Sequence, residues 1–595
     1  MKKIFANKAV LGVALLSMLV PAISSCSAGS ENGNTIYVHV LNAEDYMDDE
    51  LLTSFEEEVY EEDGKRVKII YETYDTNETM YNTLKTGKQT YDILCCSDYM
   101  IQRLAREEMI SSFADFLEDG SLSNYTDYVS PFLADYSGNG AGKLNQIKVQ
   151  IPNGTDSDGN IIYDETHDLT EYTVGYMWGT LGILYNPELI VQKNGNLFRA
   201  NEDYEDYSDE ELQELIVEQF SSIDGYSYLW EKEFKGTQSI KDSMRDTYAI
   251  GIFEVFKDQF SSESASYLAD YDDRNELFNS CDDATIKKVE QALINLKENI
   301  FGFEVDSGKD DIVTKKIGVN IAWSGDATNA IGRGYYADDD MTIPRDEEDE
   351  VVLYYTIPSL GANIWFDSWA QPMHDEAYYE SDECKYAIEF LNYLNDPWNA
   401  MDNMSYNGYT TFVGTNADDQ EILNYILYCY DLTDPEDDEA NAELDEYDLS
   451  YYFDFVDEEG NPLEYIDVTV VDPFAETDEE ALEGDGREFR FEDEDGDGKI
   501  DVIIKTDLTS FEGRSLVAQY PSESDIDNLY VMRDFGTQND KIVSMWENVK
   551  VNPLPVWVVV VLITFIVGVL AYLASYKAIK RYKVAKRKAL RKQQL

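Results

Sequence analysis

Short apolar runs and amphipathic stretches alternate along most of this chain. Runs rich in β-branched and aromatic residues predict buried strands, and apolar residues three and four positions apart predict helices. Within 48–60, for example, Leu51, Phe55 and Val59 fall on one helical face. The predicted strands are 35–41, 66–74, 93–96, 175–185, 317–323, 351–357 and 364–370, and the predicted helices are 48–60, 77–84, 101–107, 284–300 and 384–395. This alternation is typical of an α/β fold with a mostly parallel sheet covered on both faces.

Two segments interrupt the alternation. Residues 137–170 are rich in Gly, Asn and Asp and contain a hairpin-like turn at Asp158-Gly159-Asn160. Residues 432–507 are strongly acidic and have weak periodicity. We expect both segments to be insertions on a compact core.

The N-terminal 25 residues have the pattern of a signal peptide. Three lysines precede an apolar stretch, and small residues follow it. Cys26 comes directly after Ile23-Ser24-Ser25, which resembles a bacterial lipobox. We therefore expect a lipoprotein signal peptide at 1–25, a lipid on Cys26 and a polar tether at 26–34. An ordinary signal peptide with an incidental cysteine is the alternative.

A second apolar segment lies near the C-terminus. Residues 556–574 carry no charge, and this segment is long enough for a membrane-spanning helix. The tail at 577–595 has nine Lys and Arg and no acid. Positive flanks stay cytoplasmic. The pattern predicts a transmembrane helix at 555–576 and a basic cytoplasmic tail at 577–595, with the rest on the extracytoplasmic face of the cell membrane. A buried core helix is the alternative.

The composition narrows the function. The whole chain has a formal charge of −73, and the part between the leader and the tail has a formal charge of about −85. Such a negative charge makes nucleic acid a very unlikely ligand. Such a surface attracts cations. Aromatic residues make up 13% of the chain, unlike in disordered acidic proteins. The six cysteines show no disulfide framework, and adjacent Cys95 and Cys96 are expected to be small buried side chains.

Several short motifs occur in a fixed order. They lie at 76–81, 91–94, 97–99, 172–179, 242–246, 323–326, 365–368, 408–410 and 537–540. Together they resemble the polyamine-binding proteins of bacterial ABC importers, the spermidine/putrescine (PotD) family, over most of 35–550. None of the motifs is decisive alone; their order makes the signal specific.

The resemblance implies a two-lobe periplasmic-binding-protein-like fold of type II, with crossed hinge strands and a cleft that closes on its ligand. On this basis lobe 1 comprises 35–173 and 363–405, and lobe 2 comprises 174–362 and 406–550. It also implies separate ABC permease and ATPase subunits as partners. No catalytic residue pattern is visible, so we expect no enzyme and no cofactor.

The residues agree with a polyamine ligand. Such a ligand needs carboxylates for its ammonium groups and aromatic walls for its methylenes, and a buried ammonium without a charge partner is costly. Trp365 and Asp367 are two residues apart on a predicted strand, so both point to one face.

By resemblance, Asp367 pairs with a ligand amine, Trp365 and Trp323 stack on its chain, and Asp246 with Asp242 holds a second amine. The remaining ligand-binding candidates are Glu44, Tyr46, Ser97, Tyr99, Tyr409 and Gln538. Other roles stay open for some of these residues. Trp323 could be a core residue, Asp242 could cap the following helix, and Asp246 could pair with Arg245 or solvent.

The sequence departs from the family at two positions. Ala43 stands where the family usually has a tryptophan, beside Glu44 and Asp45, and Asp246 is shorter than the expected glutamate. A different organic cation is therefore an alternative ligand, and a cell-surface sensor or adhesion ectodomain is an alternative function.

The acidic insertion contains a calcium-loop-like spacing. Asp493, Asp495, Asp497 and Asp501 follow the pattern of a loop that binds Ca²⁺, but the twelfth position is Ile504 and not Glu. A structural calcium site and a hairpin turn between 489–491 and 502–504 explain the spacing equally well.

Overall fold

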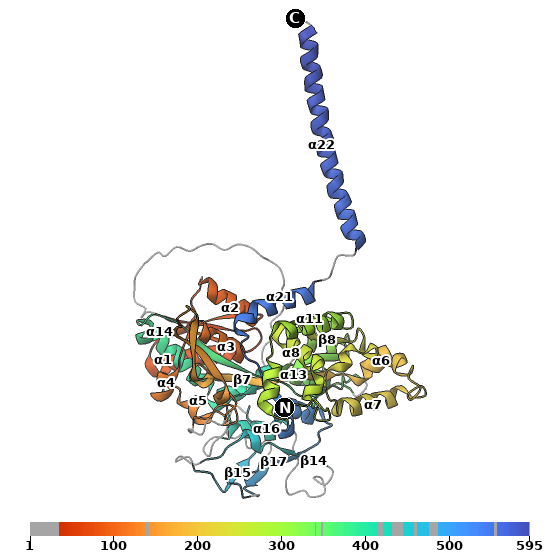
Figure 1. The fold of residues 1–595 in the computed structure, drawn as a ribbon. Coiled ribbons are helices and arrows are strands. Elements are labelled where there is room, and N and C mark those ends of the chain that lie inside the picture. The colour runs from red at the N-terminus through yellow and green to blue at the C-terminus, as the bar shows by residue number, and fades with distance from the viewer. Residues whose placement is uncertain are drawn as a thin grey trace. The chain divides into compact units, whose positions relative to one another are not determined.

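The computed structural model describes residues 35–87, 89–136, 142–338, 341–346, 349–414, 420–430, 444–456, 461–474, 486–494, 496–551 and 556–593. The chain forms two compact units, Met1–Ile542 and Val543–Leu595. The first unit contains the whole α/β core (Figure 1). The proposed lobe boundaries within it remain a prediction.

One large sheet organises the first unit. Its main path runs β2-β1-β3-β12-β7-β10-β8-β9, and β4, β11, β13 and β18 pair at its sides. Its strands are β1 (Ile36–Ala43), β2 (Val67–Tyr74), β3 (Ile93–Ser97), β4 (Ile110–Ser111), β7 (Val174–Tyr185), β8 (Gln238–Lys241), β9 (Gly302–Glu304), β10 (Val319–Trp323), β11 (Tyr354–Thr356), β12 (Ala362–Pro372), β13 (Thr410–Thr411) and β18 (Leu529–Val531).

Two long strands join the halves of this sheet. Residues Val174–Thr180 of β7 pair with β12, whereas Leu181–Tyr185 pair with β10. Every residue of β7 is buried, as expected for an apolar strand covered on both faces. Strands β7 and β12 are antiparallel to each other, β7 is antiparallel to β10, and β12 is antiparallel to β3, so the sheet is mixed. The expectation of a mostly parallel sheet is therefore wrong, since apolar runs do not encode strand direction.

Helices lie on either side of β7 (Figure 1). In α1, Leu51, Phe55 and Val59 are buried as predicted, Asp48 caps the first turn, and Gly64 ends the helix at a φ of 65°. The helices of this unit are α1 (Asp49–Asp63), α2 (Asn77–Thr86), α3 (Asp98–Arg106), α4 (Ala114–Glu118), α5 (Ser123–Tyr128), α6 (Pro187–Phe198), α7 (Asp209–Ser221), α8 (Met244–Val255), α9 (Lys257–Phe260), α10 (Tyr271–Phe278), α11 (Asp283–Lys297), α12 (Ser307–Val313), α13 (Ser324–Tyr335), α14 (Asp382–Leu394), α15 (Pro397–Asn407), α16 (Glu421–Cys429), α19 (Phe511–Gln519) and α20 (Glu523–Ile526).

The two predicted insertions form small sheets of their own. Strands β5 (Lys148–Thr155) and β6 (Ile161–Asp168) make a hairpin around the predicted turn. In the acidic insertion, β14 (Asp445–Asp448) pairs with β17 (Ile503–Thr506), and β15 (Tyr465–Thr469) pairs with β16 (Glu488–Glu492). Of the predicted hairpin, the turn is present, because the Asp501 N–H donates to the Glu492 carbonyl at 3.0 Å, but β16 and β17 each pair with an earlier strand and not with each other.

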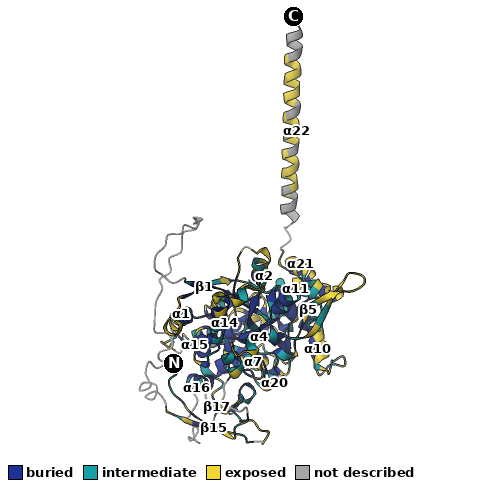
Figure 2. Ribbon diagram, turned by 90° about the vertical axis from the view of Figure 1, so that its left-hand side faces the viewer, coloured by how far each residue is buried: buried dark blue, intermediate teal, exposed yellow. Residues whose placement is uncertain are grey.

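Helix α21 (Asn539–Lys550) leads into the second unit, which contains α22 (Val556–Gln593). Most described side chains of α22 are exposed (Figure 2). Within the described residues, no helix is long and apolar enough to cross a membrane. The expected transmembrane helix at 555–576 is therefore not supported: a helix covers 556–576, but it continues into the predicted basic tail, and several of its side chains lie outside the description.

Candidate functional site

A cavity of about 150 Å³ lies where several strands of the large sheet end. Residues at or just beyond the carboxyl ends of β1, β3, β8, β9 and β10 line it, which is where open α/β sheets commonly bind ligands. Ten of the eleven predicted ligand-binding residues line this cavity: Glu44, Tyr46, Ser97, Tyr99, Asp242, Asp246, Trp323, Trp365, Asp367 and Tyr409. The fold thus brings together residues far apart in the sequence.

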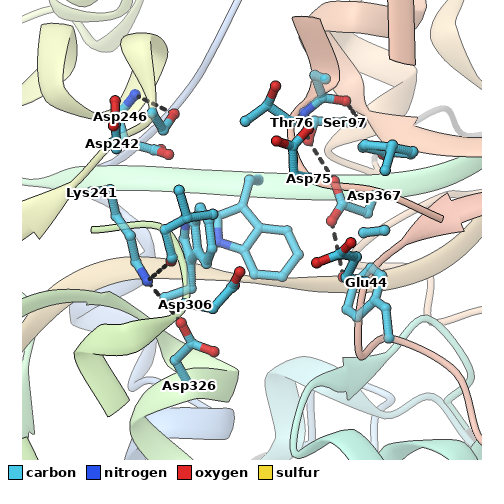
Figure 3. Close-up of a pocket in the computed structure, with 18 of the residues that line it drawn as sticks. Glu44, Asp75, Thr76, Ser97, Lys241, Asp242, Asp246, Asp306, Asp326 and Asp367 are labelled. Atoms are coloured by element: carbon cyan, nitrogen blue, oxygen red, sulfur yellow. Dashed lines mark hydrogen bonds and ion pairs between the residues drawn. The ribbon is translucent and has the colours of Figure 1, made fainter. Parts of the chain in front are cut away.

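Asp367 is the central acid of one wall (Figure 3). Ser97 lies opposite it on the neighbouring strand, and the Ser97 hydroxyl donates to Asp367 Oδ1 at 2.6 Å. The Tyr46 hydroxyl donates to Oδ2 at 2.9 Å. Asn77 supports this arrangement by donating from Nδ2 to Ser97 Oγ at 3.0 Å. Among the described residues, Asp367 accepts these neutral hydrogen bonds and forms no ion pair with Lys or Arg.

The surroundings of Asp367 change its protonation. Its pKa is raised to about 6, mainly by burial and to a smaller extent by the Asp246 charge, although the hydrogen bonds from Ser97 and Tyr46 act in the opposite direction. A cationic partner would stabilise the charged form of this carboxyl group, because it would offset the cost of burying the carboxylate charge.

Aromatic rings form the floor between the walls. The Tyr409 ring packs edge-on against Tyr46, with centroids 5.1 Å apart, and against Trp365, with centroids 5.6 Å apart. Two glycines permit this close packing. A Cβ on Gly325 would lie 2.3 Å from the Tyr409 ring, and one on Gly179 would lie 2.6 Å from the Trp365 ring. The strand spacing correctly predicted that Trp365 and Asp367 face the same space.

Asp242 and Asp246 lie on the opposite wall (Figure 3). Ser243 caps α8 by accepting the Asp246 N–H, so the cap is Ser243 and not Asp242. Burial raises the pKa of Asp246, while Ser243, Lys241, Arg245 and the Trp323 indole favour its charged form. The Arg245 guanidinium itself lies 3.6 Å from the centroid of Phe535.

Lys241 was not anticipated, and it adds a cation to this wall. Its side chain is only 1% exposed, and its Nζ lies 2.8 Å from Asp326 and 3.2 Å from Glu304. The same ammonium lies 4.1 Å from the centroid of the Trp323 ring. Trp323 is partly buried and lines the cavity, so it is not a fully buried core residue, and its contact with a ligand stays a prediction.

The loop after β1 lies at the cavity. Ala43, Glu44 and Asp45 all line the space. Asp45 has a φ of 51°, which is uncommon for a residue other than glycine. Ala43 brings only a methyl group to the cavity lining.

Further lining residues were missed at the sequence level. Lys241 directly precedes the motif at 242–246, and Asp326 is the last residue of the motif at 323–326. A lysine at the end of a strand as buried as β8 indicates a charge partner. Glu304, Asp306 and Lys309 belong to no such motif. Gln538, by contrast, does not line the cavity, because it ends the 3₁₀ turn Gly536–Gln538 just before α21.

The other predicted sites receive no support. Asp493 and Asp501 accept backbone N–H groups of their own turn, from Gly496 and Glu494. Asp495 lies outside the described residues, and no group of acids, His or Cys among the described ones could hold a metal ion. Calcium binding at Asp493, Asp495, Asp497 and Asp501 is therefore unsupported. Cys26 also lies outside the described residues, whereas Cys95 and Cys96 are buried and free, as expected.

Comparison with known proteins gives consistent relatives at low identity. No protein-family model matches the chain. It is 22% identical over 384 residues to the spermidine/putrescine-binding periplasmic protein of Escherichia coli, covering 64% of this chain and 79% of that protein. It is 23% identical over 362 residues to the putrescine-binding periplasmic protein SpuD of Pseudomonas aeruginosa, covering 60% and 74%. These similarities agree with the resemblance found in the motifs.

Among solved structures, a putative spermidine/putrescine ABC transporter protein from Listeria monocytogenes covers 86% of this chain and 98% of its own, with a TM-score of 0.47 and 20% identity. The PotD protein of Streptococcus pneumoniae, solved with calcium and HEPES, covers 64% and 83%, with a TM-score of 0.39 and 22% identity. Both TM-scores are below 0.5.

Proposed function

We propose that this chain is the substrate-binding protein of an ABC importer and captures a polyamine of the putrescine or spermidine class in the cavity around Asp367. One observation carries the proposal most strongly. Asp367 is a desolvated carboxylate among aromatic rings, and neutral hydroxyls rather than a cation of the protein satisfy it. The names of the similar proteins support the same ligand class.

The chemistry follows from the two walls. A ligand ammonium binds Asp367, whose two oxygens are held in position by Ser97 and Tyr46. The methylene chain lies against Trp365 and Trp323, and a second ammonium pairs with Asp246 beside Asp242. Binding is all that this site needs to do, and we expect no catalytic step.

At the level of the whole protein, we propose two lobes that close on the ligand, with β7 and β12 as the crossed hinge strands. Release to separate permease and ATPase subunits follows. A lipid on Cys26 would hold the protein at the extracytoplasmic face.

Another organic cation is the second candidate, and Ala43 is the observation that favours it. The cavity lacks an aromatic side chain at this position. A bulkier or aromatic cation could use the space beside Glu44 and Asp45.

Calorimetric titration of the purified full-length chain tests the proposal. We expect saturable binding of putrescine or spermidine, and Asp367→Ala to weaken it by about 100-fold, because truncating one partner of a buried charge pair costs about 2–5 kcal/mol. Asp402→Asn is the matched control. Asp402 also has a pKa raised to about 6, by burial and nearby acids, but it does not line the cavity. Absence of heat with both ligands, or equal binding by Asp367→Ala, would contradict the proposal.

A further inference from the structure

The protein places an ammonium group of its own inside the proposed polyamine site. Lys241 ends β8 with its side chain 1% exposed, and Nζ contacts both Asp326 and Glu304. It also donates to the backbone carbonyl of Val305 at 3.0 Å. These three acceptors match the three N–H donors of an ammonium, so its hydrogen-bonding capacity is filled.

The Lys241 ammonium also contacts an aromatic ring of the cavity, that of Trp323. Its Nζ lies 4.1 Å from the centroid of the Trp323 ring, within the range of a cation–π contact. One cation position, with its carboxylates and its ring, is thus already occupied. Since Asp326 and Glu304 pair with Lys241, they offer less to a ligand amine than a carboxylate without a cation.

Two other carboxylates of the cavity, Asp367 and Asp246, differ from Asp326 and Glu304 in their partners. Among the described residues, neither Asp367 nor Asp246 forms an ion pair with Lys or Arg, although both line the cavity. Arg245, the nearest arginine in sequence, donates instead to the carbonyl of Arg533 at 2.7 Å. Figure 3 shows Asp367 on one wall and Asp246 on the other, with Lys241 below Asp246. The space between them therefore has one of these carboxylates at each end and the ammonium of Lys241 at its side. Lys309 and further acids also line the cavity, among them Glu44, Asp45, Asp75, Glu78, Asp242 and Asp306.

We propose that Lys241 is a specificity-determining residue that limits the cavity to ligands with two ammonium groups, so that a short α,ω-diamine binds and a triamine is rejected. The diamine spans Asp367 and Asp246. A third ammonium would meet the like charge of Lys241, and such juxtaposition is a common means of excluding a competing ligand. This inference rests on the proposed function and adds the ligand class to it.

A lysine that only stabilises the fold would have another effect. Its removal would lower stability and would weaken diamine and triamine binding alike. A specificity role changes the ratio of the two affinities, and that ratio is the quantity to measure.

Calorimetric titration of the full-length chain with putrescine and spermidine, for the native protein and Lys241→Met, measures this ratio. We expect the native protein to bind putrescine at least about tenfold tighter, and Lys241→Met to shift the ratio toward spermidine by at least about tenfold, as expected for one unfavourable charge contact. Lys309→Met is the matched control. The Nζ of Lys309 lies 3.6 Å from Asp326 Oδ1 in the same cavity. We expect the loss of this lysine to raise the affinity for both ligands similarly, so that the ratio of the two affinities does not change.

Each outcome decides something different. If both ligands bind but the native protein prefers spermidine, or Lys241→Met leaves the ratio unchanged, the specificity role is contradicted and the proposed function stands. A ratio shift of the same size in Lys309→Met contradicts it too, because general cavity charge would then select the ligand. If neither polyamine binds the native protein, the proposed function fails, and this inference fails with it.

Lys241→Met leaves two buried carboxylates without their main partner and could fail to fold. Thermal unfolding of each variant detects this. The second variant is Lys241→Met with Asp326→Asn, which removes the cation together with its nearest acid. We expect the same shift toward spermidine from this pair, and an unchanged ratio would count against the role of Lys241.

Discussion

At the scale of single residues, the proposed function depends on the charge of Asp367. Burial and, to a smaller extent, the nearby charge of Asp246 together raise the pKa of this carboxyl to about 6. The Asp326 carboxyl behaves in the opposite way. Burial alone would raise its pKa, but the ammonium groups of Lys241 and Lys309 hold it below the ordinary value. The two carboxyls therefore differ because one has cations of the protein beside it and the other does not.

Polyamine affinity is expected to fall in mild acid. An acid with a pKa of about 6 in the free protein is mostly neutral one unit lower, so binding at pH 5 should be about tenfold weaker than at pH 7.5. Titration at both pH values measures this, since putrescine keeps both charges throughout. Asp402→Asn should retain the pH dependence, whereas any residual binding by Asp367→Asn should lose most of it. An affinity that is constant from pH 5 to 7.5 would contradict the assignment.

At the scale of elements, strand ends build the site. Ser97, Lys241, Glu304 and Trp323 are the last residues of β3, β8, β9 and β10. Helix α13 begins at Ser324, next to Trp323, which brings Asp326 in its first turn to the ammonium of Lys241. A small shift of α13 would therefore move a wall of the cavity.

Gly325→Ala tests this packing. Its new Cβ would lie 2.3 Å from the Tyr409 ring, so the ring or α13 must move, and we expect a loss of about 1–3 kcal/mol in the free energy of unfolding. Gly332→Ala is the matched control within the same helix. Its Cβ would meet the thioether sulfur of Met341 at 3.0 Å, and a flexible side chain can give way. Thermal unfolding compares the two variants, and equal melting temperatures would count against the role of the Gly325 contact.

The sequence predicts these elements better than it predicts their directions and partners. Periodicity located β1, β2 and α1 to within a few residues, because their apolar spacing is local. The predicted strand at 351–357 is shorter, with only Tyr354–Thr356 paired to β7. Strand direction depends on contacts distant in sequence, so the mixed sheet could not be foreseen. Likewise, Lys241 became a site residue only when the fold placed it over Trp323.

At the scale of the whole molecule, the site joins distant parts of a highly acidic chain. Tyr46 and Asp367 are 321 positions apart in sequence and share a hydrogen bond. The strand that carries Asp367, β12, is connected to β10, the strand of Trp323, through β7, which pairs with β12 in its first part and with β10 in its second. With a formal charge of −73, the chain also attracts dications from solution. In the proposed function, a ligand with a cation at each end binds both walls at once.

The most direct test of this account is a crystal structure of the full-length chain with putrescine. We predict one ammonium within hydrogen-bond distance of Asp367, the other at Asp246, the methylenes against Trp365 and Trp323, and Lys241 still paired with Asp326. A cavity without ligand at saturating putrescine, or a ligand bound away from Asp367, would contradict the central claim.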